Sequence, residues 1–262
     1  MQTSVFQKQT RNKNVVNCLY HNRDALFRLV CFPWAGGNSY HFAKWGQNIS
    51  SLVEVHAIRL AGRESQLQEP FPKDIYQVVD EVVCALLPVL QGENFAFFGH
   101  SLGSYLAFMT ALHLKEKCKL EPVHLFVSGV NPPHSKARYC IPEESLSEEQ
   151  ITSQLKKPGG TPKDFFEDDT CLQFPRLLAD VYLGSNYIFD TPSEVPLSCD
   201  LTCFTGSDDI PEDFKAWGDV TSGSCDTHVL PGNHFYLMEP SNEIFIKNYI
   251  TKTLEASMIH YI

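Results

Sequence analysis

The sequence is short of positive charge for its length. Its 262 residues include 21 Lys and Arg against 31 Asp and Glu, which gives a formal net charge of −10. Nucleic acids and anionic membranes bind mainly through clusters of basic side chains, so this balance argues against either as the main partner. An acidic partner would need a local basic patch.

Long apolar runs and Cys-x-x-Cys pairs are also absent. No run approaches the roughly 20 residues of a membrane-spanning helix, and residues 1–14 are polar and mildly basic, so we expect neither membrane insertion nor a secretory signal. The nine cysteines are scattered, and Cys31, Cys84 and Cys203 fall inside apolar patterns. We therefore expect reduced, mostly buried thiols in a cytosolic protein.

Short β-prone runs alternate with helical patterns along most of the chain. The runs lie at residues 27–32, 54–60, 95–98, 123–128, 201–205 and 226–230. The clearest helix spans residues 74–90, where apolar residues form one stripe. This alternation predicts an α/β fold with a mostly parallel central sheet covered by helices on both faces.

The alternation stops between residues 131 and 196, where prolines and acidic residues cluster and no strand pattern appears. Its apolar side chains have no strands of their own to cover. We interpret the chain as a single domain, residues 1–262, with an inserted helical lid at residues 131–196. The alternative is a separate helical packing unit without a role in the active site.

A nucleophile elbow is predicted at Gly-His-Ser-Leu-Gly, residues 99–103. A buried-strand pattern precedes it and a helical pattern follows it. Such a strand–turn–helix exposes the hydroxyl of Ser101, while Gly99 and Gly103 lack the β-carbons that would clash. The helix that begins after Ser101 directs free N–H groups, including that of Leu102, at a developing oxyanion.

A serine nucleophile needs a base and a carboxylate that orients the base. His234 lies in a glycine-containing loop directly after the last predicted strand, whereas His228 falls within that strand and fits a structural role. The carboxylate is expected after the strand at 201–205, where Asp208 and Asp209 are adjacent. The local pattern leaves both open, because either side chain could point inward from a turn.

The loop after the first predicted strand reads Cys-Phe-Pro-Trp-Ala-Gly-Gly-Asn at residues 31–38. Paired glycines allow close approach of the backbone, so this loop is expected to supply the second oxyanion N–H. The alternative is a tight glycine-rich turn without that role.

Together these residues resemble type II thioesterases, most of all the members that act with animal fatty acid synthase. The resemblance covers nearly the whole chain and rests on motifs at residues 31–37, 42–45, 59–64, 97–103, 206–209 and 231–235. It implies an α/β-hydrolase fold and hydrolysis of fatty acyl thioesters that releases medium-chain fatty acids. No metal and no cofactor is implied.

The resemblance also implies roles for single residues. Ser101 is the nucleophile, His234 the base, and Asp209, three residues after the strand-end glycine, the orienting acid. The second oxyanion amide falls in the Trp34–Ala35 pair, with Ala35 favoured. The implied partner is the acyl carrier protein domain of fatty acid synthase, with its phosphopantetheine thioester, and we expect a monomer.

Two rival functions are left open by the sequence. The elbow alone also fits a general carboxylesterase or lipase, and a hydrolase fold can serve as a non-catalytic binding protein, although the complete set of catalytic residues argues against the latter. In the lid, Phe165, Phe166 and Phe174 are hypothesised to line the acyl-binding site.

Docking of an acidic carrier would require basic residues near the site. The candidates are Arg59, Arg63, Lys156, Lys157 and Arg176. For the first two the alternative is structural, pairing with Glu64 or with backbone carbonyls.

Overall fold

The computed structural model describes residues 15–64, 69–136, 170–185, 187, 189, 194–209 and 211–259, with the backbone alone at 170–174 and 259. A seven-stranded sheet runs through the molecule in the order β1-β3-β2-β4-β5-β6-β7. Only the β1–β3 pair is antiparallel. The strands are β1 (Val16–Asn17), β2 (Phe27–Phe32), β3 (Val53–Ile58), β4 (Asn94–His100), β5 (His124–Ser128), β6 (Asp200–Gly206) and β7 (Cys225–Leu230).

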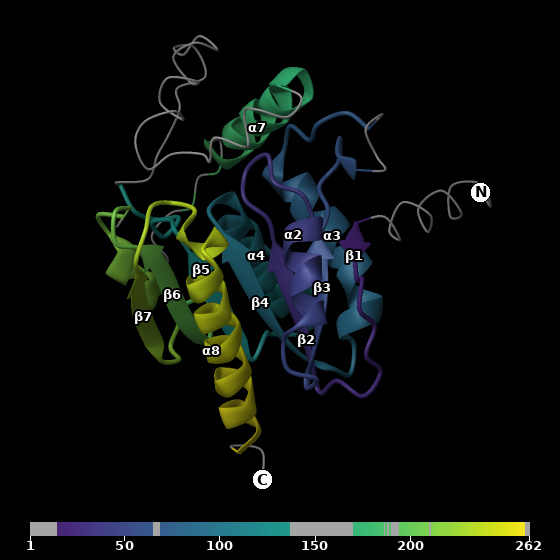
Figure 1. Ribbon diagram of the computed structural model, residues 1–262, viewed down its shortest axis with the longest axis vertical. Helices are drawn as coiled ribbons and strands as arrows, with labels where there is room; N and C mark the ends of the chain where they lie inside the picture. Colours follow the sequence, from purple (N-terminus) through teal and green to yellow (C-terminus); the bar gives the residue numbers. More distant parts are fainter. Residues whose placement is uncertain are drawn as a thin grey trace, which may run out of the picture.

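Helices cover both faces of this sheet (Figure 1). On one face lie α3 (Ile75–Leu90) and α4 (Leu102–His113), and on the other lie α2 (Tyr40–Ala43) and α8 (Pro240–Ile259). Helix α7 (Thr170–Ser185) lies beyond one end of the strands. Short helical segments are η1 (Lys44–Gln47), η3 (Leu114–Cys118), η4 (Phe214–Val220) and η5 (Tyr236–Met238).

Two separate apolar cores stabilise the sheet, one on each face. The first joins α3, α4 and part of α7 to the sheet, and Phe97, Leu106 and Phe108 are fully buried in it. The second joins α8 and the segment 42–45 to the other face, where Phe98 is fully buried. Adjacent strand residues therefore point into opposite cores, as the pleat requires.

All six predicted strands are present, with ends shifted by at most two residues. The predicted helix at 74–90 is also confirmed, because Asp74 accepts a hydrogen bond from Tyr76 N–H and α3 begins at Ile75. The sequence reading missed β1, since two residues carry no period. Most of the proposed lid, 131–196, lies outside the described residues, so its extent stays a prediction.

The cysteines only partly follow expectation. Cys31 and Cys203 are buried in strands, as predicted, but Cys84 is exposed, and Cys225 is exposed as well. Cys84 lies between Val83 and Ala85, both buried, so it occupies the outer side of α3 although its neighbours are apolar. Within the described part of the chain, no helix combines the length and apolarity needed to span a bilayer.

Candidate active site

Strand β4 runs into helix α4 through the predicted elbow. Ser101 has φ 54° and ψ −121°, a conformation that non-glycine residues seldom adopt. A β-carbon at Gly99 would lie 2.2 Å from Gly103 O, and one at Gly103 would lie 2.1 Å from Phe32 O. These approaches overlap atoms, so both positions require glycine and the strained turn at Ser101 is held from both sides.

Two backbone segments near this turn are the predicted sources of oxyanion donors. Helix α4 begins at Leu102, whose N–H lies at its free N-terminal end. The second segment is the turn from Trp34 to Gly37, closed by a 2.9 Å hydrogen bond from Gly37 N–H to Trp34 O. Gly36 has φ 74° at the third position of this turn, which is the type II form.

His234 and Asp209 are brought together by the loops after β7 and β6. His234 Nδ1 lies 2.5 Å from Asp209 Oδ2. Asp208 is exposed and accepts a hydrogen bond from the hydroxyl of Ser207 instead. The pair that the sequence left open is thus distinguished by contact, and the arrangement favours Asp209 as the residue that orients His234.

The end of β5 connects His234 with the elbow. Ser101 N–H donates to Ser128 O at 2.8 Å, and a β-carbon at Gly129 would lie 3.4 Å from His234 Cε1. The rings of His100 and His234 have centroids 4.9 Å apart. His234 therefore lies beside the turn that carries Ser101.

A hydrogen-bonded network of buried, uncharged side chains lies next to His234 and the elbow. His100 Nδ1 lies 2.8 Å from Ser128 Oγ, which lies 2.6 Å from the hydroxyl of Tyr236. Burial, followed by the neighbouring His234, lowers the pKa of His100 well below its usual value. Burial likewise raises the pKa of Tyr236. His100 is thus a neutral packing partner of His234.

The loop that contains the turn 34–37, predicted to supply the second oxyanion N–H, is held by buried charges that the sequence did not predict. Arg63 Nη2 lies 2.8 and 2.9 Å from the two carboxylate oxygens of Asp180 on α7, and Arg63 Nη1 donates to Gly37 O. Glu64 accepts hydrogen bonds from the backbone N–H and hydroxyl of Ser39. In the sequence, Asp180 is a single aspartate within a helical pattern, and nothing about that pattern indicates its contact with Arg63.

These contacts correct the docking hypothesis for the first two arginines. The side chain of Arg63 is 1% exposed, and Arg59 Nη1 lies 3.7 Å from Glu64 Oε2. Neither guanidinium is free to meet a partner, and the structural alternative holds for both.

The remaining predicted residues are only partly described. Trp34 is buried and makes edge-to-face contacts with the rings of His100 and Phe235, and Ala35 is partly buried beside the first core. Arg176 is partly exposed on α7. Phe165, Phe166, Lys156, Lys157 and the side chain of Phe174 lie outside the described residues.

One group of side chains in the described ranges has the spacing of metal ligands. Ligand atoms of Cys18, His21 and Glu54 lie within 4.8 Å of one another. The Glu54 carboxylate, however, already accepts from Asn22 N–H and contacts His56 Nε2 at 2.7 Å. These contacts explain Glu54 as a structural residue. It lies near the start of β3, whereas Ser101 follows the end of β4, so the group is at the opposite end of the parallel strands from Ser101.

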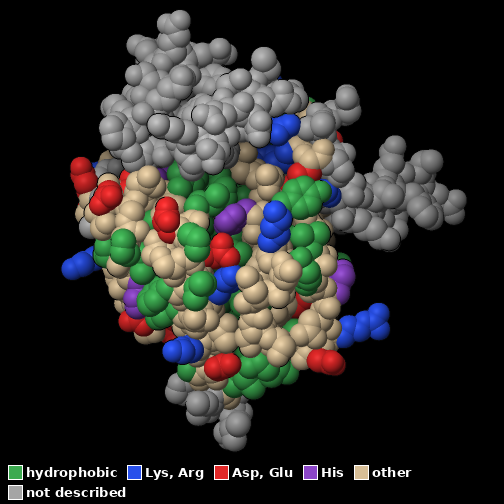
Figure 2. Space-filling view, viewed as in Figure 1, with side chains coloured by type: hydrophobic (Ala, Val, Ile, Leu, Met, Phe, Trp, Pro, Cys, Tyr) green, Lys and Arg blue, Asp and Glu red, His purple; other side chains and the backbone are tan. Residues whose placement is uncertain are grey.

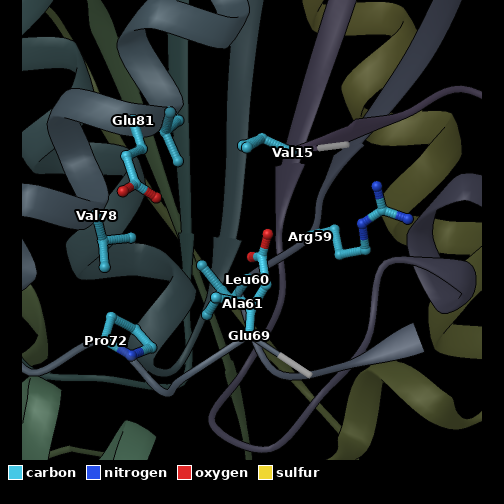
Figure 3. Close-up of a pocket in the computed structure, with 9 residues that line it drawn as sticks. Val15, Arg59, Leu60, Ala61, Glu69, Pro72, Val78 and Glu81 are labelled. Atoms are coloured by element: carbon cyan, nitrogen blue, oxygen red, sulfur yellow. The ribbon is translucent and has the colours of Figure 1, made fainter. Parts of the chain in front are cut away.

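A concavity lies between α3 and the segment after β3 (Figure 3). Its lining includes Arg59, Glu69 and Glu81, but no hydroxyl, thiol or imidazole side chain. It therefore lacks the serine and histidine that the predicted chemistry needs, and it is separate from the elbow.

The fold and the elbow define a hydrolase of the α/β-hydrolase class. A family model described as "Thioesterase domain" matches residues 27–253. The chain belongs to the thioesterase family, and it is a thioesterase enzyme.

Individual proteins show the same relationship. The chain is 56% identical to the rat protein named S-acyl fatty acid synthase thioesterase, medium chain, covering 99% of this chain and 100% of the relative. The human protein of the same name is also 56% identical, over 96% of each chain. A crystal structure of human thioesterase 2 superposes with a TM-score of 0.69 at 49% identity, covering 89% of this chain and 98% of that one.

Proposed function

We propose that this thioesterase cleaves fatty acyl thioesters through Ser101, His234 and Asp209. The observation that carries the proposal is the 2.5 Å contact between His234 Nδ1 and Asp209 Oδ2 beside the strained elbow. With Nδ1–H directed at the carboxylate, Nε2 is left as the basic nitrogen of the imidazole. Nε2 takes the proton of the Ser101 hydroxyl as the oxygen attacks the thioester carbonyl.

The tetrahedral oxyanion is stabilised by the N–H groups of Leu102 and Ala35. Collapse of the intermediate breaks the C–S bond, and the departing sulfur leaves as a thiol that receives its proton from His234. A thiol with a pKa near 8.5 is a good leaving group and needs little assistance. Water then attacks the acyl ester of Ser101 with His234 again as base, which releases the fatty acid and restores the enzyme.

We assign medium-chain acyl groups on the carrier domain of fatty acid synthase as the substrates. The support is the printed name of the rat and human relatives, together with their near full-length match. Phe165, Phe166 and Phe174 remain the candidates for the acyl-binding wall. Each buried methylene contributes about 0.8 kcal/mol, so preference should rise with chain length until the acyl site ends.

The carrier must dock on a surface of mixed charge. Acidic and basic side chains are interspersed on the face shown in Figure 2, and the whole chain has a net charge of −10. Long-range attraction to an acidic carrier is therefore weak, and recognition depends on a local basic group. Lys156, Lys157 and Arg176 are the remaining candidates for this basic group. We also propose that the enzyme acts as a cytosolic monomer.

The test compares hydrolysis of a decanoyl thioester with that of a p-nitrophenyl ester by the wild type and by Ser101→Ala. We expect thioester turnover by the wild type and its loss in Ser101→Ala, with the fold retained, because the change removes one oxygen. Faster turnover of the simple ester than of the thioester would identify a general carboxylesterase. Absence of turnover by the wild type, or unchanged turnover by Ser101→Ala, would refute the proposal.

A further inference from the structure

Helix α7 reaches into the oxyanion loop through one buried carboxylate. Asp180 Oδ2 accepts a 2.7 Å hydrogen bond from Gly36 N–H. Both oxygens of the same carboxylate accept from Arg63 Nη2, and Arg63 Nη1 donates to Gly37 O at 2.7 Å. Asp180 and Arg63 are 0% and 1% exposed, so these bonds form away from water, where they are strong and costly to break.

The hydrogen bond falls on the peptide group that defines the turn type. In a turn closed from Gly37 to Trp34, the peptide between Ala35 and Gly36 is the central one, and types I and II differ by its rotation. Accepting from Gly36 N–H favours one of the two orientations. The N–H of Ala35, the proposed oxyanion donor, belongs to the preceding peptide, so its place depends on how firmly the whole turn is anchored by Asp180 at Gly36 N–H and by Arg63 at Gly37 O.

The same helix also contacts the other oxyanion segment. A β-carbon at Gly184 on α7 would lie 3.1 Å from Leu102 Cδ1, so the backbone of α7 lies directly on the residue that follows the nucleophile. Leu177 and Leu183 on α7 are buried. One helix thus touches both backbone segments that are proposed to stabilise the oxyanion.

Simple coverage of the site would not require a buried ion pair. Apolar side chains of similar volume commonly replace such a pair without loss of stability. The placement of Asp180 on a backbone N–H, rather than on Arg63 alone, adds something that apolar packing lacks: a directional acceptor for the turn.

We infer that Asp180 is a positioning residue for hydrolysis, which together with Arg63 anchors the turn 34–37 so that Ala35 N–H is held at the oxyanion. Helix α7 is then a structural support of the oxyanion hole as well as a cover for the site. The inference rests on the proposed function, because it assumes that Ser101 forms a tetrahedral intermediate at this turn. It predicts a defect in transition-state stabilisation and none in substrate binding.

The experiment uses paired replacements that remove the buried charges together, so that neither ion is left alone. R63M/D180N keeps an acceptor for Gly36 N–H, whereas R63M/D180L keeps none at similar volume. Losing an oxyanion donor lowers kcat about 10²- to 10³-fold. Because the N–H here is displaced with its turn and not removed, we expect kcat of the leucine pair to fall about 10- to 100-fold with KM nearly unchanged. The asparagine pair should recover most of this loss.

A transition-state mimic separates positioning from general structural damage. An acyl trifluoromethyl ketone forms a tetrahedral adduct with Ser101, so its inhibition constant should rise in the leucine pair by the same factor by which kcat/KM falls. Binding of decanoic acid should not change. Ser185→Ala, on the same helix, is the matched control and should keep the wild-type kcat, since its hydroxyl donates to Val181 O within α7 and the change leaves the Asp180–Gly36 hydrogen bond in place.

A folded leucine pair, shown by circular dichroism and Tm, with wild-type kcat and inhibitor affinity would overturn the inference. Equal losses in both pairs, with no recovery by asparagine, would also overturn it. If the leucine pair does not fold, R63M/D180A provides the same comparison with a smaller side chain. Loss of activity in Ser101→Ala tests the proposed function separately, so failure of one does not imply failure of the other.

Discussion

The proposed nucleophile side of the site, at Ser101 and His234, and the proposed oxyanion side, at the turn 34–37, are held in place by different interactions. Ser101 and His234 lie on turns that directly follow β4 and β7, and a neutral network of His100, Ser128 and Tyr236 supports them. The oxyanion turn is held instead by Arg63 and Asp180, which lie 117 residues apart in the chain. The elbow itself depends on local backbone geometry, whereas the turn 34–37 depends on a buried ion pair whose two members come from distant segments of the chain.

This difference explains what each side tolerates. Glycine is required at positions 99 and 103 because a β-carbon there would lie 2.2 and 2.1 Å from backbone oxygens, so the elbow is fixed once the strands form. The oxyanion turn depends on α7 packing correctly. Replacement of Asp180 on α7 should therefore alter catalysis without disturbing the elbow.

The largest expected effect lies on the nucleophile side. Asp209→Asn should lower kcat about 10⁴-fold, because an amide holds His234 in the wrong tautomer and orientation. Steady-state kinetics with a decanoyl thioester measures this loss. Asp208→Asn is the matched control, and a small effect is expected since Asp208 is exposed and contacts Ser207. A reversed order would assign the orienting role to Asp208.

Acid should lower the free energy of unfolding, because buried histidine side chains are neutral in the folded protein. Burial lowers the pKa of His124, at the start of the strand that ends at Ser128, from 6.5 to about 4, although Asp200 and Asp226 raise it. Between these values the unfolded chain binds more protons, so the free energy of unfolding falls as pH drops from 6.5 to 4 and is fully retained above 6.5.

The contribution of His124 over this range is about 3 kcal/mol, at about 1.4 kcal/mol per pKa unit. Urea titrations at pH 7 and pH 4.5 measure it. In His124→Gln this part of the pH dependence should disappear, with the hydrogen bond to Thr202 replaced by the amide. An unchanged slope in the variant would show that His124 is not the responsible group.

A smaller effect is expected at the far end of the neutral network. Tyr236→Phe removes the hydroxyl that lies 2.6 Å from Ser128 Oγ, and the loss of one buried hydrogen bond costs about 1 kcal/mol of unfolding free energy. The fall in kcat should be only a few-fold, because His100 and Asp209 still hold His234. A loss as large as that of Asp209→Asn would make Tyr236 a member of the catalytic group.

The sequence was sufficient to predict the parts of the site that are local. The elbow at 99–103, the strands and the loop with His234 all carry short-range patterns, so six strands and the helix 74–90 could be located from periodicity and turn residues. The acid could be narrowed only to Asp208 or Asp209, since the orientation of a side chain on a turn depends on its neighbours.

Contacts between distant segments were not predictable in the same way. Arg63 looked like a surface cation because it lies in a polar loop, yet its partner Asp180 comes from α7, and together they are buried. Cys84 illustrates the same limit, because a helix with apolar residues on most sides still exposes one of them. Long-range packing decided both cases.

The most direct test of the proposed mechanism is detection of the acyl-enzyme. The wild type is mixed with a decanoyl thioester, quenched with acid within the first turnover, and digested for peptide mass spectrometry. We predict a decanoyl ester on Ser101, absent from Ser101→Ala. An acyl group on a different residue, or hydrolysis with full turnover in Ser101→Ala, would contradict the assignment of Ser101 as the nucleophile.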